Sequence, residues 1–191
     1  MVFSSLLFVF LFLALNLVCY YSVKTIRQKN IVLLVFSLIF YAWGGAAYLL
    51  LLAGMAFWSW LCALMIEKKQ NKKSGLILMW ISVAVSLSFL LIFKYADFLI
   101  ENVNQLPGVS LPLSKLSLPI GISFYTFQII SYTVDVWRGD TKAQRNIISF
   151  GTYVSLFPQL IAGPIVRYTD IERELQERKH SVTLAASGIK R

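Results

Sequence analysis

The sequence has little charge, two cysteines and a single histidine. Charged residues make up 14% of the 191 residues, whereas a soluble domain has about a quarter. This scarcity, together with a hydrophobic content of 58%, excludes an ordinary soluble or disordered chain. Cys19 and Cys62 both lie inside apolar runs, so we expect neither a disulfide framework nor a thiolate metal site.

Recognisable catalytic motifs are missing as well. No serine lies in a nucleophile-elbow pattern, no Cys/His spacing fits a metal, and no glycine-rich loop could hold a phosphate. His180 stands in the charged stretch 177–181, so we interpret it as a surface side chain and not as a general base. The residues by themselves predict no catalytic group, no metal and no bound cofactor.

What the chain has is long apolar runs, which predict an all-α, polytopic transmembrane bundle. The run from Ile31 to Ile66 would be about 54 Å long as one helix, nearly twice a hydrocarbon core of about 30 Å. It must therefore fold back, and Gly44-Gly45 is the expected turn because glycine adopts turn conformations readily. The expected spans are about residues 2–23, 46–66, 76–93 and 119–137, with a short arm at about 31–43.

The net charge of +9 then indicates an orientation in the bilayer and not a nucleic-acid partner. Basic residues gather in the loops 24–29 and 67–73, and such clusters favour the cytoplasmic side. The N-terminus is therefore expected outside the cytoplasm. Tyr41, Trp43 and Tyr48 flank the expected turn between the arm and the next span, which places this turn at the outer interface of the membrane.

Residues 147–166 form a run long enough to cross the membrane, but Pro158 and Gly163-Pro164 interrupt it. A full crossing would put the basic tail that follows on the outer side. A re-entrant segment keeps every basic residue except Lys94 and Lys115 in the cytoplasm, so we prefer it, with a full span as the alternative.

The charged tail predicts a surface helix at about residues 170–180. Thr169 and Glu172 have the spacing of a capping box, which would start this helix. The helix would lie either in solvent or on the cytoplasmic membrane surface, and membrane lipid is an expected partner. Arg167, just before it, would either contact phosphates of a donor molecule or anchor the chain to anionic lipid.

Polar side chains lie on one face of the last expected span. Gln128, Ser131 and Asp135 occupy positions i, i+3 and i+7, with Tyr132 beside them, and a polar face in a span is expected to point into the bundle. These side chains would either line a substrate path or join helices by hydrogen bonds, and Asp135 would alternatively pair with Arg138. The complete set of substrate-path candidates is Gln128, Ser131, Tyr132, Asp135, Pro158, Gln159, Gly163, Pro164 and Arg167.

Four stretches of the sequence are distinctive: NIVLLVFSLIFYAWGG at 30–45, FKYADFLIENVN at 93–104, LPIGISFYTFQIISYTVDVWRG at 118–139 and FPQLIAGPIVRY at 157–168. Together they resemble the membrane-bound O-acyltransferase family, in its bacterial alginate O-acetyltransferase branch. The last two stretches are similar to the two signature segments in the N-terminal half of that family, and their order and separation make the resemblance specific.

The resemblance implies a multi-pass enzyme of the bacterial inner membrane. Such an enzyme moves an acyl group, usually acetyl, from a cytoplasmic donor to a hydroxyl of a polysaccharide on the outer side. The implied donor is acetyl-CoA or an acyl carrier, bound as a substrate, and the implied partners are periplasmic polysaccharide-acetylation proteins.

The essential histidine of this family lies in a later helix, and His180 does not match its motif. We therefore expect this chain to be an N-terminal part of such an enzyme, inactive alone. A small transporter or channel subunit with a broken helix is the alternative from another class, and a non-catalytic membrane scaffold is a third reading.

Overall fold

The computed structural model describes residues 5–70, 72–106, 109–114, 116–163, 165–178, 181 and 187. Within these residues the chain is all-helical and contains no strand, which confirms the all-α class. The elements, in chain order, are the π-helix η1 (Phe8–Leu13) and the α-helices α1 (Ala14–Ser22), α2 (Ile26–Ala42), α3 (Ala46–Lys68), α4 (Lys73–Val103), α5 (Ile122–Arg138), α6 (Ile147–Ser155), α7 (Phe157–Ala162) and α8 (Tyr168–Glu177).

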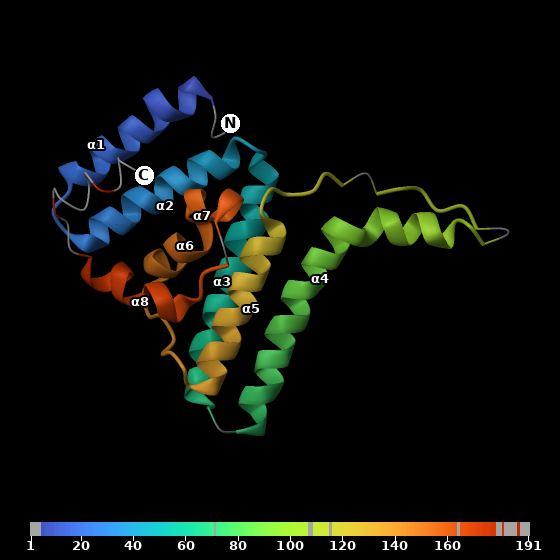
Figure 1. The fold of residues 1–191 in the computed structure, drawn as a ribbon. Helices are drawn as coiled ribbons and strands as arrows, with labels where there is room; N and C mark the ends of the chain where they lie inside the picture. Colours follow the sequence, from blue (N-terminus) through green and yellow to red (C-terminus); the bar gives the residue numbers. More distant parts are fainter. Residues whose placement is uncertain are drawn as a thin grey trace.

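Helices α3, α4 and α5 run side by side, and α1 and α2 lie together across them (Figure 1). Helix α6 packs against α2 and α3, and α8 contacts α2, α5 and α6. We call the end of the bundle that carries the α3–α4 loop, the α5–α6 loop and α8 the basic end. The opposite end carries the α2–α3 turn and the start of α5.

In the part of the chain that the structure describes, two helices are long and apolar enough to cross a bilayer, by length and composition: α3, with a mean hydropathy of 2.2, and α4, with 2.6. Only 39% and 22% of their most apolar stretches are buried within the protein. Large apolar side chains such as Leu50 and Trp80 are exposed instead, whereas a core helix of a soluble protein would bury most of such residues. The crossing of a membrane by the other expected spans stays a prediction.

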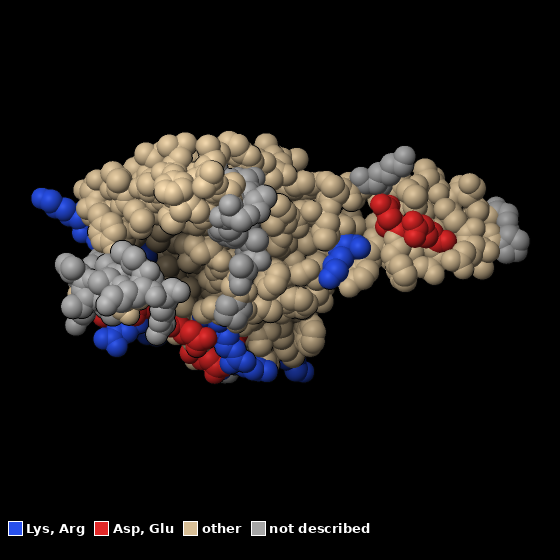
Figure 2. All heavy atoms as spheres, turned by 45° about the horizontal axis from the view of Figure 1, so that its top comes forward, with Lys and Arg blue, Asp and Glu red and all other residues tan. Residues whose placement is uncertain are grey.

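The charged residues are unevenly distributed over the surface that Figure 2 shows. Lysine, arginine, aspartate and glutamate gather mostly along one edge of the helical body and on a projecting arm, and a broad uncharged face lies between them. A surface with a wide uncharged band is what a chain in contact with lipid requires.

Local sequence signals explain the bounds of α2 and the turn that follows it. Thr25 and Gln28 form a capping box, in which the Thr25 hydroxyl accepts from the Gln28 N–H (3.3 Å). Helix α2 therefore starts well before the expected arm at 31–43. It ends at the Gly44-Gly45 pair, where Gly45 has a φ of +148° and a Cβ would come within 2.8 Å of the Tyr48 ring.

Helix α4 continues ten residues past the expected end of its span at Phe93, because no proline or glycine interrupts the chain before Val103. Its last turns project from the body as an arm, and the chain returns alongside them (Figure 1). The carboxylate of Asp97 fastens this return by accepting from the Ser114 N–H (2.7 Å).

The run at 147–166 is broken at Leu156, between α6 and α7, and again at Gly163. The first break comes two residues before Pro158, because a proline is tolerated in the first turn of a helix but not in its interior. The chain returns to the end from which it started, since Gln144 before the run donates to the hydroxyl of Tyr168 after it (2.7 Å).

The capping-box prediction for α8 is wrong. The helix starts at Tyr168, so Thr169 lies inside its first turn, and the N-cap residue Arg167 makes no side-chain cap. Glu172 accepts instead from the Thr141 hydroxyl (3.1 Å) and so ties α8 to the α5–α6 loop. The sequence spacing of Thr169 and Glu172 could not show that the Glu172 carboxylate has a hydrogen-bond partner on another element.

Candidate functional site

The candidate side chains on α5 point into the protein. Gln128, Tyr132 and Asp135 are 2%, 0% and 4% exposed, and Ser131 is half-buried, with its hydroxyl 3.5 Å from the Asp135 carboxylate. The four side chains point the same way because positions i, i+3, i+4 and i+7 share one face of a helix. Their role in a substrate path stays a prediction.

Helix α5 is held in this orientation where it begins. Its N-cap residue Gly121 has a left-handed φ of +74°, which favours glycine, and a Cβ there would lie 2.8 Å from the Leu160 carbonyl oxygen. The start of α5 can therefore approach the backbone of α7 closely. This approach fixes how closely α7, in the broken segment, packs against the start of α5.

The candidates in the broken segment have different surroundings. Pro158 is exposed, whereas the Gln159 amide nitrogen is buried and has no hydrogen-bond partner among the described residues. Gly163 ends α7, and Pro164 lies outside the described residues. Arg167 is exposed, and its positive charge is one of those that act on the Asp135 carboxylate, together with the charges of Asp140 and Arg138.

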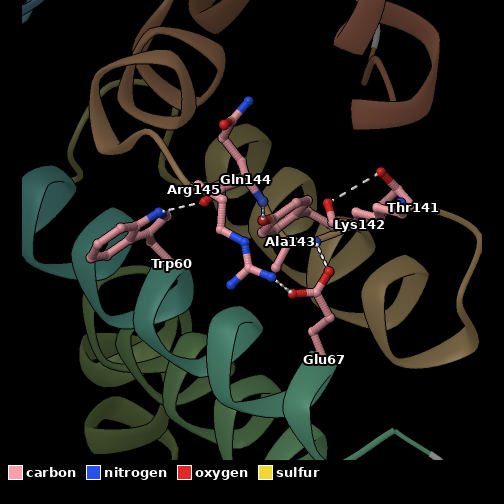
Figure 3. Close-up of polar contacts among 8 residues, drawn as sticks. Trp60, Glu67, Thr141, Lys142, Ala143, Gln144 and Arg145 are labelled. Carbon is pink, nitrogen blue, oxygen red and sulfur yellow. Dashed lines mark hydrogen bonds and ion pairs between the residues drawn. The ribbon is translucent and has the colours of Figure 1, made fainter.

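A hydrogen-bonded joint at the basic end fixes the α5–α6 loop between α3 and α5 (Figure 3). The Glu67 carboxylate on α3 accepts from the Ala143 N–H (3.2 Å) and pairs with Arg145 (2.5 Å). The Trp60 indole donates to the carbonyl of Gln144 (2.7 Å). Sequence reasoning missed Glu67 and Gln144, because their partners lie far away in the chain.

Gln144 is the centre of this joint. Its backbone N–H donates to the Tyr132 hydroxyl (2.8 Å), its side-chain amide nitrogen donates to the Tyr168 hydroxyl (2.7 Å), and its amide oxygen accepts from the Asn146 N–H (2.9 Å). Asn146 in turn caps α6 by accepting from Ile148 (2.9 Å). One loop residue thus ties α5, α6 and α8 to one another.

Aromatic rings fill the space behind these hydrogen bonds. The Tyr132 ring packs against Phe150 and Tyr168, with centroids 4.7 and 5.0 Å apart, and Tyr153 packs against Tyr168 at 5.3 Å. Burial raises the pKa of the Tyr168 phenol to about 12, although the hydrogen bond from Gln144 lowers it. Tyr168 is therefore a neutral hydrogen-bonding group at physiological pH.

Asn30 joins α2 to α6 and α8 and was also missed by sequence reasoning. Its side chain is 1% exposed, and its amide nitrogen donates to the Ser149 hydroxyl (3.3 Å) and the Leu175 carbonyl (3.0 Å). Its amide oxygen accepts from Arg178. A polar residue in the first turns of an apolar helix was the only available signal.

The described part of the chain holds no group of three or more His, Cys, Asp or Glu side chains that could bind a metal. His180 lies outside that part. The arrangement at the basic end can fix helices relative to one another, and its described residues assemble no nucleophile with a base.

The chain is similar over its whole length to named relatives. It is 42% identical over 202 residues to a probable alginate O-acetylase of Pseudomonas aeruginosa, and 41% identical over 199 residues to that of Pseudomonas putida. These alignments cover 100% of this chain but 38% and 40% of the relatives. A peptidoglycan O-acetyltransferase of Helicobacter pylori is 26% identical over 208 residues, which cover 94% of this chain and 40% of that protein.

This chain thus spans about two fifths of the length of the curated relatives it matches. No protein-family model matches the chain, and no solved structure matches it significantly. The resemblance that the four distinctive stretches carry in the sequence is confirmed by the alginate O-acetylases.

Proposed function

Because this chain belongs to the family of the alginate O-acetylases, we propose that it is part of a membrane-bound O-acyltransferase. The enzyme transfers acetyl groups to hydroxyls of an envelope or exported polysaccharide. The observation that carries this proposal is similarity along 94–100% of the chain to relatives named for two different acceptors, alginate and peptidoglycan. What those names share is O-acetyl transfer to a glycan.

The proposed setting is the bacterial inner membrane, with several crossings and with the basic end in the cytoplasm. Two long apolar helices with mostly exposed side chains support the crossings. The bond between Gln144 and Tyr168 supports a re-entrant segment at 147–166, because the chain enters and leaves it at one end. Basic residues around 24–29 and 67–73 support the cytoplasmic assignment of that end.

The chemistry proposed for the complete enzyme is acyl transfer from a thioester. The hydroxyl oxygen of the acceptor attacks the acyl carbonyl, the carbon–sulfur bond breaks, and the thiol of acetyl-CoA or an acyl carrier leaves with a proton. We assign no described residue as the base. Periplasmic polysaccharide-acetylation proteins would act on the outer side together with the enzyme.

The residues of this chain would line the part of the substrate path that the acyl donor enters. Arg167 offers a guanidinium to donor phosphates, and the Asp135 carboxylate is within reach of its electrostatic influence. Gln128 and Ser131 continue the same polar face into the bundle. The joint around Gln144 keeps α5, α6 and α8 in fixed relative positions, so that this lining is preorganised.

Acetylation of the polysaccharide of the host tests the proposal. Deleting the gene should remove ester-bound acetate, measured by proton NMR of the purified polymer, and the unchanged gene should restore it. Genes carrying Gln128→Leu or Arg167→Gln should restore about tenfold less ester-bound acetate than the unchanged gene. This is the loss expected for one polar contact to a charged group.

Matched controls are Phe127→Leu, on the exposed face of α5, and Arg173→Gln, on the exposed face of α8. Both should restore full acetylation. Unchanged acetate after deletion of the gene would contradict the proposed function. Full restoration by both test variants would contradict only the donor-side path.

A further inference from the structure

Three helix ends meet at one corner of the molecule, outside the joint around Gln144. The end of α1, the first turns of α2 and the end of α8 come together there (Figure 1). The Asn30 amide on α2 donates to the Leu175 carbonyl on α8 (3.0 Å), which fixes these two helices to each other. We call this place the cationic corner, and its residues are Tyr20 on α1, Lys29 on α2 and Arg178 at the C-cap of α8.

The buried Tyr20 ring gathers the two cations of the corner. The Lys29 ammonium nitrogen lies over this ring, 5.2 Å from its centroid, and the Arg178 guanidinium carbon lies over the same ring at 5.6 Å. The face of an aromatic ring attracts a cation, so the ring holds both groups near one another. The ring itself is neutral and leaves both positive charges uncompensated.

No carboxylate among the described residues pairs with Lys29 or Arg178. Glu177 precedes Arg178 in the chain, but it lines a shallow hollow on another face of α8 together with Arg173. The sequence after Arg178 contains no aspartate or glutamate. Both cations are half-buried, where water screens their mutual repulsion less than at a fully exposed site. A bound anion would relieve this repulsion.

Both cations keep nitrogen atoms that a ligand can reach. Arg178 donates one N–H to the Asn30 amide oxygen, and its Nε is enclosed by the protein. Its Nη1 and the Lys29 ammonium nitrogen have no hydrogen-bond partner among the described residues and are not among the enclosed atoms. A guanidinium and an ammonium with free N–H groups are typical ligands of a phosphate.

The surface beside the cationic corner distinguishes a lipid from a soluble phosphate. Helix α1 and the π-helix before it expose the large apolar side chains of Leu11, Leu15 and Val18, which are 52%, 49% and 64% exposed. The spacings of four and three residues place these side chains on one face. A place with cations at one end and an apolar strip leading away from it suits an amphipathic anion.

We propose that the cationic corner binds the phosphate of one anionic phospholipid, whose tails lie along α1. In the proposed orientation the corner lies where the first apolar run ends and the basic residues 24–29 begin, which is the level of the cytoplasmic headgroups. The site uses this membrane placement but does not depend on acetyl transfer. A phosphate bound there links α2 to α8, the helix that carries Tyr168 of the joint.

Native mass spectrometry of this chain, released from nanodiscs with equal amounts of phosphatidylglycerol and phosphatidylcholine, tests the proposal. Phosphatidylcholine has the same phosphate but carries its own compensating cation. The unchanged chain should retain one phosphatidylglycerol in preference to phosphatidylcholine. Lys29→Gln should lower the ratio of the two bound lipids about tenfold, as expected for one lost charge-assisted hydrogen bond. Lys29→Arg should preserve the ratio, because it keeps the charge and the donors.

Matched controls are Lys68→Gln and Lys72→Gln, which make the same change in net charge at exposed positions of the basic end. Both should retain phosphatidylglycerol as the unchanged chain does. The proposal is overturned if the unchanged chain shows no preference between the two lipids. It is equally overturned if Lys68→Gln lowers the ratio as much as Lys29→Gln, because the attraction would then belong to the whole basic end.

Inorganic phosphate is the other source of the same chemistry. An excess of it, compared with chloride at the same ionic strength, should leave the bound phosphatidylglycerol in place, because a free phosphate makes no contact with α1. Displacement of the lipid by inorganic phosphate would overturn the assignment to a lipid.

Discussion

The buried tyrosines at the two ends of the bundle differ in the hydrogen bonds of their hydroxyls. At the basic end the hydroxyls of Tyr132 and Tyr168 both accept hydrogen bonds from Gln144. At the opposite end the hydroxyls of Tyr41 and Tyr125 are also buried, and among the described residues they interact with each other but with no loop or helix backbone. Because an unmade buried hydrogen bond costs free energy, the basic end, whose tyrosine hydroxyls are bonded to the α5–α6 loop, is the more rigidly held of the two.

The largest stability effect in this comparison is expected for Asn30→Leu at the basic end. Leucine has a similar volume but cannot replace the hydrogen bonds to Ser149, Leu175 and Arg178. Each buried group left without a partner costs about 1–3 kcal/mol, and the costs overlap, so we expect a loss of about 3 kcal/mol. The measurement is the free energy of unfolding in mixed micelles.

Asn102→Leu is the matched control for this variant. Asn102 is exposed on the arm, and its side chain donates to the Phe98 carbonyl of its own helix (2.7 Å). Its replacement should change the free energy of unfolding by less than about 0.5 kcal/mol. Equal effects of the two variants would mean that the joint at the basic end does not hold the helices together.

A second effect is a loss of stability at alkaline pH through Tyr168. Its folded-state pKa of about 12 lies above the ordinary value of about 10, so the unfolded chain loses this proton first. The stabilisation is complete below about pH 10 and is lost as pH rises to about 12, an effect of about 2–3 kcal/mol. Tyr168→Phe should make the decline between these pH values shallower, and an unchanged slope would contradict the assignment.

Local signals in the sequence account for what could be predicted. The apolar runs predicted helices, and the Gly44-Gly45 pair marked a turn because Gly45 adopts a φ that other residues avoid. The period of α5 predicted that Gln128 and Asp135 face one way, and the structure shows both buried.

The joint at the basic end could not be predicted, because its partners are distant in the chain. Glu67 meets Arg145 across 78 positions, and Asn30 meets Leu175 across 145. The capping-box prediction for Thr169 failed for the same reason, since Glu172 bonds to Thr141 on another element. The contact between the Tyr41 and Tyr125 side chains is likewise a property of packing and has no local sequence signal.

The smallest effects come from one substitution made at both ends. Tyr132→Phe removes the acceptor of the half-buried Gln144 N–H and should cost about 1–2 kcal/mol of unfolding free energy. Tyr41→Phe removes a hydroxyl that has no bond of good geometry and should change stability by less than about 0.5 kcal/mol, or raise it slightly. Both side chains are at least nine-tenths buried and lose the same atom, so differences in burial or volume cannot explain unequal results. Equal costs in the same micelles would show that the Tyr41 hydroxyl is already paired, and the contrast between the two ends would then disappear.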